Sequence, residues 1–241
     1  MKIKSGLLIL CFFACMSARA QNWGGGVDDS NLHFGFTFQY LSSEYKILKK
    51  ENWRNIGPLA DDPNPPELKG ISSDSSPGFG IGFVVNKRLI ENADLRFTPI
   101  LVFNDRILSY HYDEIKNNIE RKISSTLVEF PLGLKLKSDR RNNFRAYVLG
   151  GAKYSMDISS KKKTNNANIT DPGDKMVNNV RNYLSYEAGL GFDLYFEYFK
   201  MSPEIKLSYS FNNVLKGEPN RYSYPIDKLM LRHVTFSLFF E

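Results

Sequence analysis

The chain has 241 residues, 42% hydrophobic and 24% charged, with a formal net charge of +6 and a mean hydropathy of −0.36. Beyond residue 20, no apolar run approaches the about 20 residues that a membrane-spanning helix needs, so a helical membrane protein is excluded. A chain of such modest hydropathy that still carries 18 Phe, 13 Tyr and 17 Gly needs another explanation.

Residues 1–20 are predicted to be a secretory signal peptide. Lys2 and Lys4 give a positive start, an apolar stretch covers residues 7–13, and residues 18–20 (Ala-Arg-Ala) fit the small-residue cleavage rule. An uncleaved anchor and a lipoprotein are the alternatives. The apolar stretch is short for an anchor, and Phe12 stands where a lipoprotein box usually has Leu. Cleavage would leave residues 21–241 as the mature protein.

Cleavage would also remove Cys11 and Cys15, the two cysteines of the chain. A mature protein without cysteine has no disulfides, no thiol catalysis and no Cys-based zinc or iron–sulfur site. Three basic residues leave with the peptide, which lowers the formal net charge to +3. With no basic helix in addition, the charge does not indicate a nucleic-acid partner.

Apolar and polar residues alternate along much of the mature chain, which predicts β-strands because successive side chains point to opposite faces. In the sixth of these segments, Leu184 and Tyr186 alternate with Ser185 and Glu187. The predicted strands are 32–40, 79–85, 95–103, 128–136, 144–154, 184–196, 199–211 and 230–240. Most exceed the roughly 5–6 residues of an average strand and fit the about 9–11 of a membrane strand.

The polar faces of these strands distinguish a membrane barrel from a soluble one. A membrane barrel turns its apolar face to lipid and keeps its polar face in the lumen. The polar faces carry charges of both signs, which predict a lumen charge network of Arg96, Glu129, Lys135, Arg145, Lys153, Glu187, Asp193, Glu204 and Lys206. They also carry glycines, which leave room for long side chains in a narrow interior.

The connections alternate in length. Segments 41–78, 104–127, 155–183 and 212–229 are long and polar, whereas 86–94, 137–143 and 197–198 are short. Long outer loops and short periplasmic turns are typical of outer-membrane barrels. The sequence therefore predicts an all-β fold, an eight-stranded antiparallel transmembrane β-barrel over residues 21–241 with both termini in the periplasm. Eight strands leave an interior that side chains can fill, which favours a plugged barrel over a channel.

Three prolines, Pro99, Pro131 and Pro203, fall within predicted strands. Proline has no N–H for the ladder of a closed sheet. We therefore expect bulges or bends at these positions, and the local registers stay open.

Residues 127–151 contain the segments VEFPL (128–132) and RAYVLGG (145–151). This stretch resembles the PorT/SprT family of Bacteroidota outer-membrane barrels, and more broadly the porin-family small outer-membrane barrels. The resemblance implies a non-enzymatic accessory role in type IX protein secretion and gliding motility, with other proteins of the secretion machinery as partners. It implies no catalytic, cofactor-binding or metal-binding residues.

One candidate for catalysis is His233 with Thr235, a base and a hydroxyl two residues apart as in lipid-modifying barrel hydrolases. The alternation places both on the lumen face, away from lipid, so a packed histidine is the favoured interpretation. His33 and His111 show no metal-ligand spacing with it. We expect no enzyme activity, no cofactor, no metal and no small-molecule substrate.

Two loop segments are candidates for contacts outside the barrel. The first long loop is predicted to be a partner loop, with Pro58, Asp61, Asp62, Pro63, Pro65 and Pro66, because barrels carry partner contacts on their loops. Lys161, Lys162 and Lys163 could contact lipopolysaccharide phosphates, or could lie on a solvated loop. The expected partners are outer-membrane lipid, lipopolysaccharide and secretion-machinery proteins. A structural or adhesive barrel without a secretion role is the alternative.

Overall fold

The computed structural model describes residues 30–55, 57–59, 63, 65–112, 118–159, 169 and 171–241. The predicted signal peptide, Asp61, Asp62 and the three lysines 161–163 lie outside these residues. The described part contains β1 (Leu32–Lys49), β2 (Gly70–Ser72), β3 (Ser76–Ile90), β4 (Ala93–Phe97), β5 (Ile100–His111), β6 (Ile119–Lys137), β7 (Phe144–Asp157), the short 3-10 helix η4 (Pro172–Asp174), β8 (Asn182–Tyr195), β9 (Lys200–Ser210) and β10 (Ile226–Phe240).

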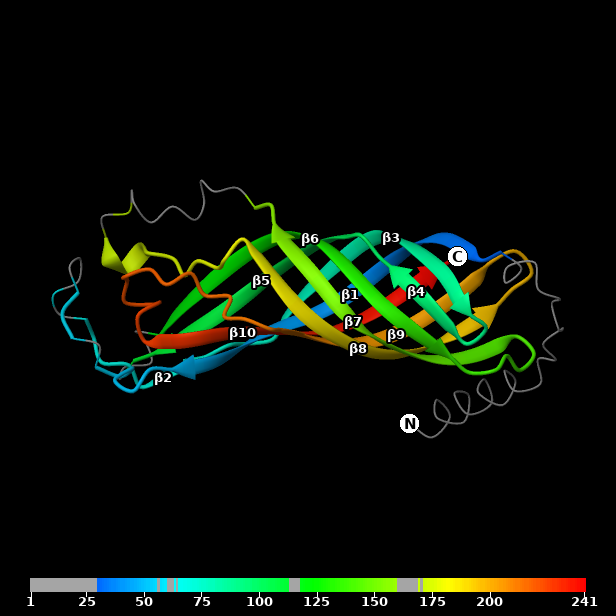
Figure 1. Cartoon of the computed structure of the whole chain (residues 1–241). Coiled ribbons are helices and arrows are strands. Elements are labelled where there is room, and N and C mark those ends of the chain that lie inside the picture. Colours follow the sequence, from blue (N-terminus) through cyan, green and yellow to red (C-terminus); the bar gives the residue numbers. More distant parts are fainter. Residues whose placement is uncertain are drawn as a thin grey trace, which may run out of the picture.

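The strands close into an antiparallel barrel (Figure 1). β10 pairs with β1, and β1 pairs with β3, which closes the ring. β4 and β5 together occupy one place between β3 and β6, and β2 adds only a short edge to β5. The ring therefore has eight members, as the alternation predicted, and each of the eight predicted strands lies within or overlaps one of them.

The two ends of the barrel differ. The turns β3–β4, β6–β7 and β8–β9 lie at one end together with the C-terminus (Figure 1). The start of the described chain lies at the same end, where the backbone N–H of Arg88 donates to the carbonyl of Asn31 at 2.8 Å. We call this the short-turn end. The long connections, with β2 and η4, lie at the opposite, long-loop end.

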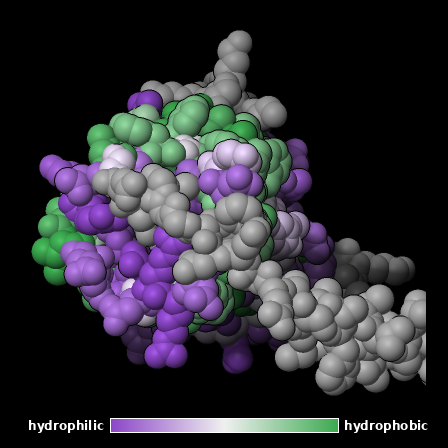
Figure 2. All heavy atoms as spheres, turned by 90° about the vertical axis from the view of Figure 1, so that its right-hand side faces the viewer, coloured by the Kyte–Doolittle hydropathy of each residue, from purple (hydrophilic) through white to green (hydrophobic). Residues whose placement is uncertain are grey.

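The outer surface of the barrel is apolar over most of its height. Phe34 is 66% exposed and Phe83 is 70% exposed, and Phe36 stacks on Phe240 across the closing pair β1–β10 with 5.2 Å between ring centroids. Figure 2 views the short-turn end, where hydrophilic surface covers much of the visible face and hydrophobic surface appears at its margins. The apolar residues thus form an outer band, which is the arrangement of a membrane barrel.

Several strands are longer than predicted. The polarity of their two faces inverts beyond the apolar band, so the alternation of the band ends before the strand does. On β1, the outward side chains are apolar up to Tyr40, whereas Lys46 farther along is exposed and Tyr45 is buried. On β6, Lys122 points outward and Ile123 is buried. Parts of the predicted loops 41–78 and 104–127 are therefore strand, and the barrel wall rises beyond the band with a soluble-type pattern of polar outside and apolar inside.

The prolines disturb the ladder less than predicted. The interruption between β4 and β5 lies at Thr98 and Pro99, yet Phe97↔Leu132 and Ile100↔Glu129 share one register with β6. Pro131 pairs with Lys153 in an unbroken register, so a bulge there was a wrong expectation. The Pro131 carbonyl accepts a hydrogen bond from Thr98 N at 3.1 Å. In an antiparallel pair, the N–H and C=O groups of one residue point to the same neighbouring strand. The N–H that proline lacks would therefore point to the interruption between β4 and β5, where no ladder pair needs it.

Pro203 also keeps its register, pairing with Leu238 of β10. On its other side, the β8–β9 ladder omits two pairs beside Pro203 and resumes in the same register at Leu194↔Met201. Pro203 therefore coincides with a local loss of pairing, and neither ladder contains the expected bulge there.

Candidate functional site

The interior of the barrel holds a lumen charge network, the set of ion-paired side chains inside the apolar band. Lys135 of β6 and Asp193 of β8 form one of its pairs, with Lys135 Nζ 2.7 Å from Asp193 Oδ1. Both side chains are almost completely inaccessible to solvent. Ser202 Oγ donates a further bond of 2.6 Å to the same carboxylate oxygen. Asp193 is thereby held by charge and by hydrogen bonding, as a buried carboxylate requires.

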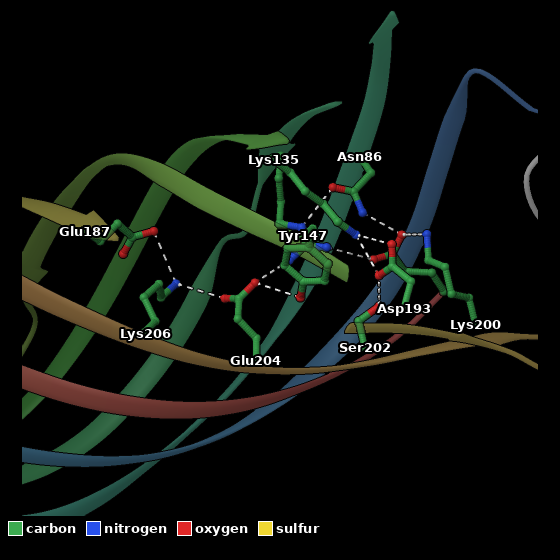
Figure 3. Close-up of polar contacts among 11 residues, drawn as sticks. Asn86, Lys135, Tyr147, Glu187, Asp193, Lys200, Ser202, Glu204 and Lys206 are labelled. Carbon is green, nitrogen blue, oxygen red and sulfur yellow. Dashed lines mark hydrogen bonds and ion pairs between the residues drawn. The ribbon is translucent and has the colours of Figure 1, made fainter. Parts of the chain in front are cut away.

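Arg96 of β4 is the centre of a second part of this network. Its Nη1 lies 2.8 Å from Glu204 Oε2 on β9, across the lumen, and its Nε donates to Asn86 Oδ1 at 2.9 Å. Tyr147 Oη donates to the same Glu204 oxygen at 2.9 Å. Figure 3 shows Asn86, Tyr147 and Glu204 converging with Lys135 and Asp193 inside the barrel. Strands on opposite walls are therefore tied together through the interior.

The last residue of the chain belongs to this network. The Glu241 side chain lies 2.8 Å from Lys200 Nζ and 3.5 Å from Arg96 Nη2, and it accepts a hydrogen bond from Asn86 Nδ2 at 2.5 Å. The backbones of Glu241 and Lys200 also exchange two hydrogen bonds of 2.7 and 2.9 Å. Glu241 thus anchors the end of β10 to three other strands.

Further pairs lie among the other predicted network residues. Lys153 Nζ is 2.9 Å from Glu129 Oε2, and Lys206 Nζ is 3.2 Å from Glu187 Oε1 and 3.9 Å from Glu204 Oε1 (Figure 3). Arg145 differs, since it is only half-buried and stands beside Asp193 in the β7–β8 register. The structure thus places eight of the nine predicted residues in buried ion pairs.

The network also contains charged residues that were not among the predicted nine, namely Asp94, Lys137, Lys200 and Glu241. Lys137 Nζ lies 2.6 Å from Asp94 Oδ1. The alternation held the necessary signal, because Asp94 is in phase with Arg96 and Lys137 with Lys135. Asp94 and Lys137 were assigned to turns because the predicted strands ended too early, whereas Lys200 lay within the predicted strand 199–211.

A second interior feature is the mouth core, an apolar cluster at the long-loop end. Its buried members are Tyr45, Leu68, Ile71, Leu108, Tyr110, Tyr112, Ile123, Val177, Tyr183, Val214, Leu215, Tyr222, Ile226, Leu229 and Leu231. Strand residues that point inward supply part of the cluster, and Leu68, Val177, Val214 and Tyr222 come from the connecting segments. The described parts of the long connections therefore fold over the barrel mouth.

Tyr222 is the polar anchor of the mouth core. Its backbone carbonyl accepts from Tyr110 Oη at 2.8 Å, and the two rings meet edge to face at 5.1 Å. Its own hydroxyl accepts from Arg121 Nη2 at 2.7 Å and donates to the carbonyl of Gly173 at 2.8 Å. Tyr222 thereby joins β5, β6 and the segment at η4. The lumen charge network lies below the mouth core, and the two together pack the interior with side chains.

His233 and Thr235 both point into the barrel and are buried. His233 Nδ1 lies 3.5 Å from Lys153 Nζ, a cation rather than a carboxylate that could orient the ring as a base. Within the described part of the chain, no group of three or more His, Cys, Asp or Glu side chains could hold a metal ion. The same residues include no helix with the length and hydropathy needed to cross a bilayer.

The predicted partner loop is only partly described. Pro58, Pro63 and Pro66 are exposed and Pro65 is half-buried. Leu68, farther along the same loop, is buried in the mouth core. The loop is thus fixed to the barrel at Leu68, among other points, and exposes several of its prolines.

Comparison with known proteins gives a family. A family model described as "Outer membrane protein beta-barrel domain" matches residues 20–216, whereas no curated protein matches the sequence. Among solved structures, outer membrane protein OprG from Pseudomonas aeruginosa is 12% identical over 87% of this chain and 93% of that chain, with a TM-score of 0.47. Neisserial surface protein A is 8% identical over 87% and 98%, with a TM-score of 0.40.

Ail, the attachment invasion locus protein of Yersinia pestis, solved in complex with the heparin analogue sucrose octasulfate, is 10% identical over 88% of this chain and 99% of that chain, with a TM-score of 0.37. The family model covers most of the sequence and agrees with the closed barrel and its apolar outer band. The chain belongs to the family of outer membrane protein β-barrel domains.

Proposed function

We propose that the protein is a sealed outer-membrane barrel that acts through protein contacts, as an accessory component of type IX secretion and gliding motility. The observation that carries this proposal is the packed interior. The lumen charge network fills the barrel within the apolar band, and the mouth core covers it at the long-loop end. An interior packed in this way favours a function on the outer surfaces of the barrel over conduction through the lumen.

The resemblance of residues 127–151 to the PorT/SprT family supports the secretion role. These residues form the β6–β7 hairpin, in which Gly133 and Gly151 are direct cross-strand partners. Glu129 of the VEFPL segment pairs with Lys153, two residues beyond the RAYVLGG segment. The residues that carry the resemblance thus also contribute to the packed interior. This supports a role as a scaffold and not as a pore.

The partner contacts are assigned to the long-loop end. There the wall rises beyond the apolar band and carries exposed charges, including Lys46, Lys122 and Arg232. Exposed prolines of the partner loop lie beside it, with Asp61 and Asp62 between them in the sequence. Since rigid scaffolds usually present functional contacts on loops, this end is the proposed contact surface. The orientation follows with it: signal peptide removed, both termini periplasmic, long loops outward.

Catalysis is not part of the proposal. A hydroxyl nucleophile needs a base within hydrogen-bond reach and an acid that orients this base. His233 instead has the ammonium group of Lys153 beside it, and both His233 and Thr235 face the interior, away from lipid. A membrane lipid has no access to them in this arrangement.

A gene deletion tests the proposal. Loss of export of cargo proteins with type IX sorting domains, restored by the native gene, is the expected result. A complementing gene with Asp61→Asn and Asp62→Asn should restore export only in part, whereas His233→Ala should restore it fully. Normal export with altered envelope integrity or adhesion would contradict the proposal and favour the structural or adhesive barrel. A change in lipid A mass in the deletion strain that the native gene reverses, and the gene with His233→Ala does not, would favour an enzyme.

A further inference from the structure

Within the residues that the structure describes, the barrel wall is incomplete at one place near the long-loop end. The β6–β7 ladder ends at Leu127↔Asp157. The last contacts between the two are Ile158 N to the Thr126 carbonyl at 2.9 Å and Thr126 N to Ser159 Oγ at 2.7 Å. β6 continues for residues 119–125, and within the described part of the chain only β5 pairs with it there. One edge of β6 therefore borders a gap.

The far side of the gap is the segment 176–178. Lys216 N donates to the Asn178 carbonyl at 2.8 Å, and Val180 N donates to the Val214 carbonyl at 2.8 Å. Val214 N in turn donates to the Leu229 carbonyl on β10 at 2.8 Å. The wall thus resumes at this segment through irregular pairing.

A cavity of about 470 Å³ lies at this gap, within the roughly 300–1,000 Å³ typical of small-molecule pockets. Its apolar lining includes Ile123 and Val177, which belong to the mouth core, and Phe79 and Phe103, which belong to the outer band. Phe79 is 60% exposed and stacks on Phe103 with 5.0 Å between ring centroids. The cavity therefore connects the surface that faces lipid with the apolar interior of the mouth.

Polar residues also contribute to the lining of the cavity, namely Asn104, Asp105, Lys122, Ser124, Ser125, Thr126, Ser159 and Asn178. Asp105 and Lys122 form an ion pair of 2.8 Å in its lining, and both side chains are substantially exposed. Hydroxyl groups of Ser124 and Thr126 lie along β6 beside them. An apolar cavity that opens to lipid and has a charged, exposed border is complementary to an amphipathic molecule.

We propose that this cavity binds an acyl chain of a lipid from the leaflet on the long-loop side. The chain would enter past Phe79 and Phe103 and reach Ile123 and Val177, and the phosphate-bearing headgroup would stay at the border near Lys122. The proposal rests on the membrane placement of the barrel and is independent of the secretion role. Its ligand is a lipid because the cavity is continuous with the band that already contacts lipid.

The experiment uses the mature barrel in vesicles of phosphatidylethanolamine and phosphatidylglycerol that contain a phosphatidylglycerol with a diazirine in its acyl chain. After irradiation, cross-linked peptides are mapped by mass spectrometry. We expect cross-links at Ile123 and Val177 in addition to those at Phe79. The first two residues point inward, so a lipid chain reaches them through the cavity. Cross-links confined to the outer band would overturn the proposal.

Two tryptophan variants on the outward face of β6 provide the control. Ser124→Trp places a ring in the cavity and should reduce the Ile123 and Val177 cross-links to the level of a sample kept dark, without affecting those at Phe79. Glu120→Trp lies four residues away on the same face, outside the lining, and should leave all cross-links intact. Equal cross-linking of Val177 in both variants would also overturn the proposal.

Discussion

Lys135 and Asp193 lie 58 residues apart on β6 and β8, yet Lys135 Nζ is within 2.7 and 2.8 Å of both carboxylate oxygens of Asp193. The pair reaches past β7, which separates their strands. Desolvation makes each charge costly unless the other compensates it. The interior is therefore stable as a set of mutually dependent partners, and the removal of one partner is the sensitive test.

Lys135→Met is expected to lower the free energy of unfolding by about 3–5 kcal/mol, because it leaves a buried carboxylate uncompensated. The measurement is urea unfolding of the refolded barrel in lipid vesicles. Lys122→Met breaks a pair of nearly equal length, 2.8 Å, whose side chains are 62% and 39% exposed; it should cost no more than about 1 kcal/mol. Equal losses for the two variants would show that burial does not control these pairs.

Gly191→Ala is expected to displace Tyr147 from the network. A Cβ atom at this position would lie 2.5 Å from Tyr147 Oη and 2.7 Å from the Pro203 carbonyl, and Tyr147 Oη is the donor to Glu204. Overpacking of this kind costs about 1–3 kcal/mol, measured by the same unfolding assay. Gly150→Ala is the matched control, since its Cβ would have no atom within 4 Å. An unchanged stability for Gly191→Ala would contradict the close packing of the lumen.

Tyr222→Phe should loosen the mouth core while the ring stays in place. It removes the hydroxyl that accepts from Arg121 and donates to the Gly173 carbonyl. Buried partners left without a hydrogen bond cost roughly 1–3 kcal/mol. We expect faster hydrogen exchange in the connection 211–225. Tyr224→Phe serves as the control because its exposed ring lies under Lys50 Nζ, a contact that phenylalanine retains. Unchanged exchange in Tyr222→Phe would contradict an anchoring role for its hydroxyl.

The alternation of side chains was sufficient to predict the ring of eight strands, their faces and most of the interior charges. The alternation could not predict which charged residues form ion pairs with one another, because it assigns a residue to a face and says nothing about its ion-pair partner across the lumen. Arg96 and Glu204 lie 108 residues apart and meet through the interior, a contact that depends on register and barrel tilt together. The pairing of Lys135 with Asp193 past β7 depends on the same geometry.

The ends of the strands were also predicted wrongly, and this error has a single physical cause. The apolar-outside pattern stops where the wall leaves the band, and beyond this level Tyr45 turns inward and Lys46 outward. If one polarity is assumed along the whole strand, the inversion resembles the start of a loop. The mouth core was missed for the same reason, since residues such as Tyr110 and Ile123 fell within predicted connections.

We propose that the barrel is sealed by the lumen charge network within the band and by the mouth core above it. The most direct measurement is ionic conductance of the purified, refolded protein in planar lipid bilayers, with a known porin as the positive control. We expect folded barrels to insert without stable conductance. A steady open channel carried by the folded protein would contradict the proposal.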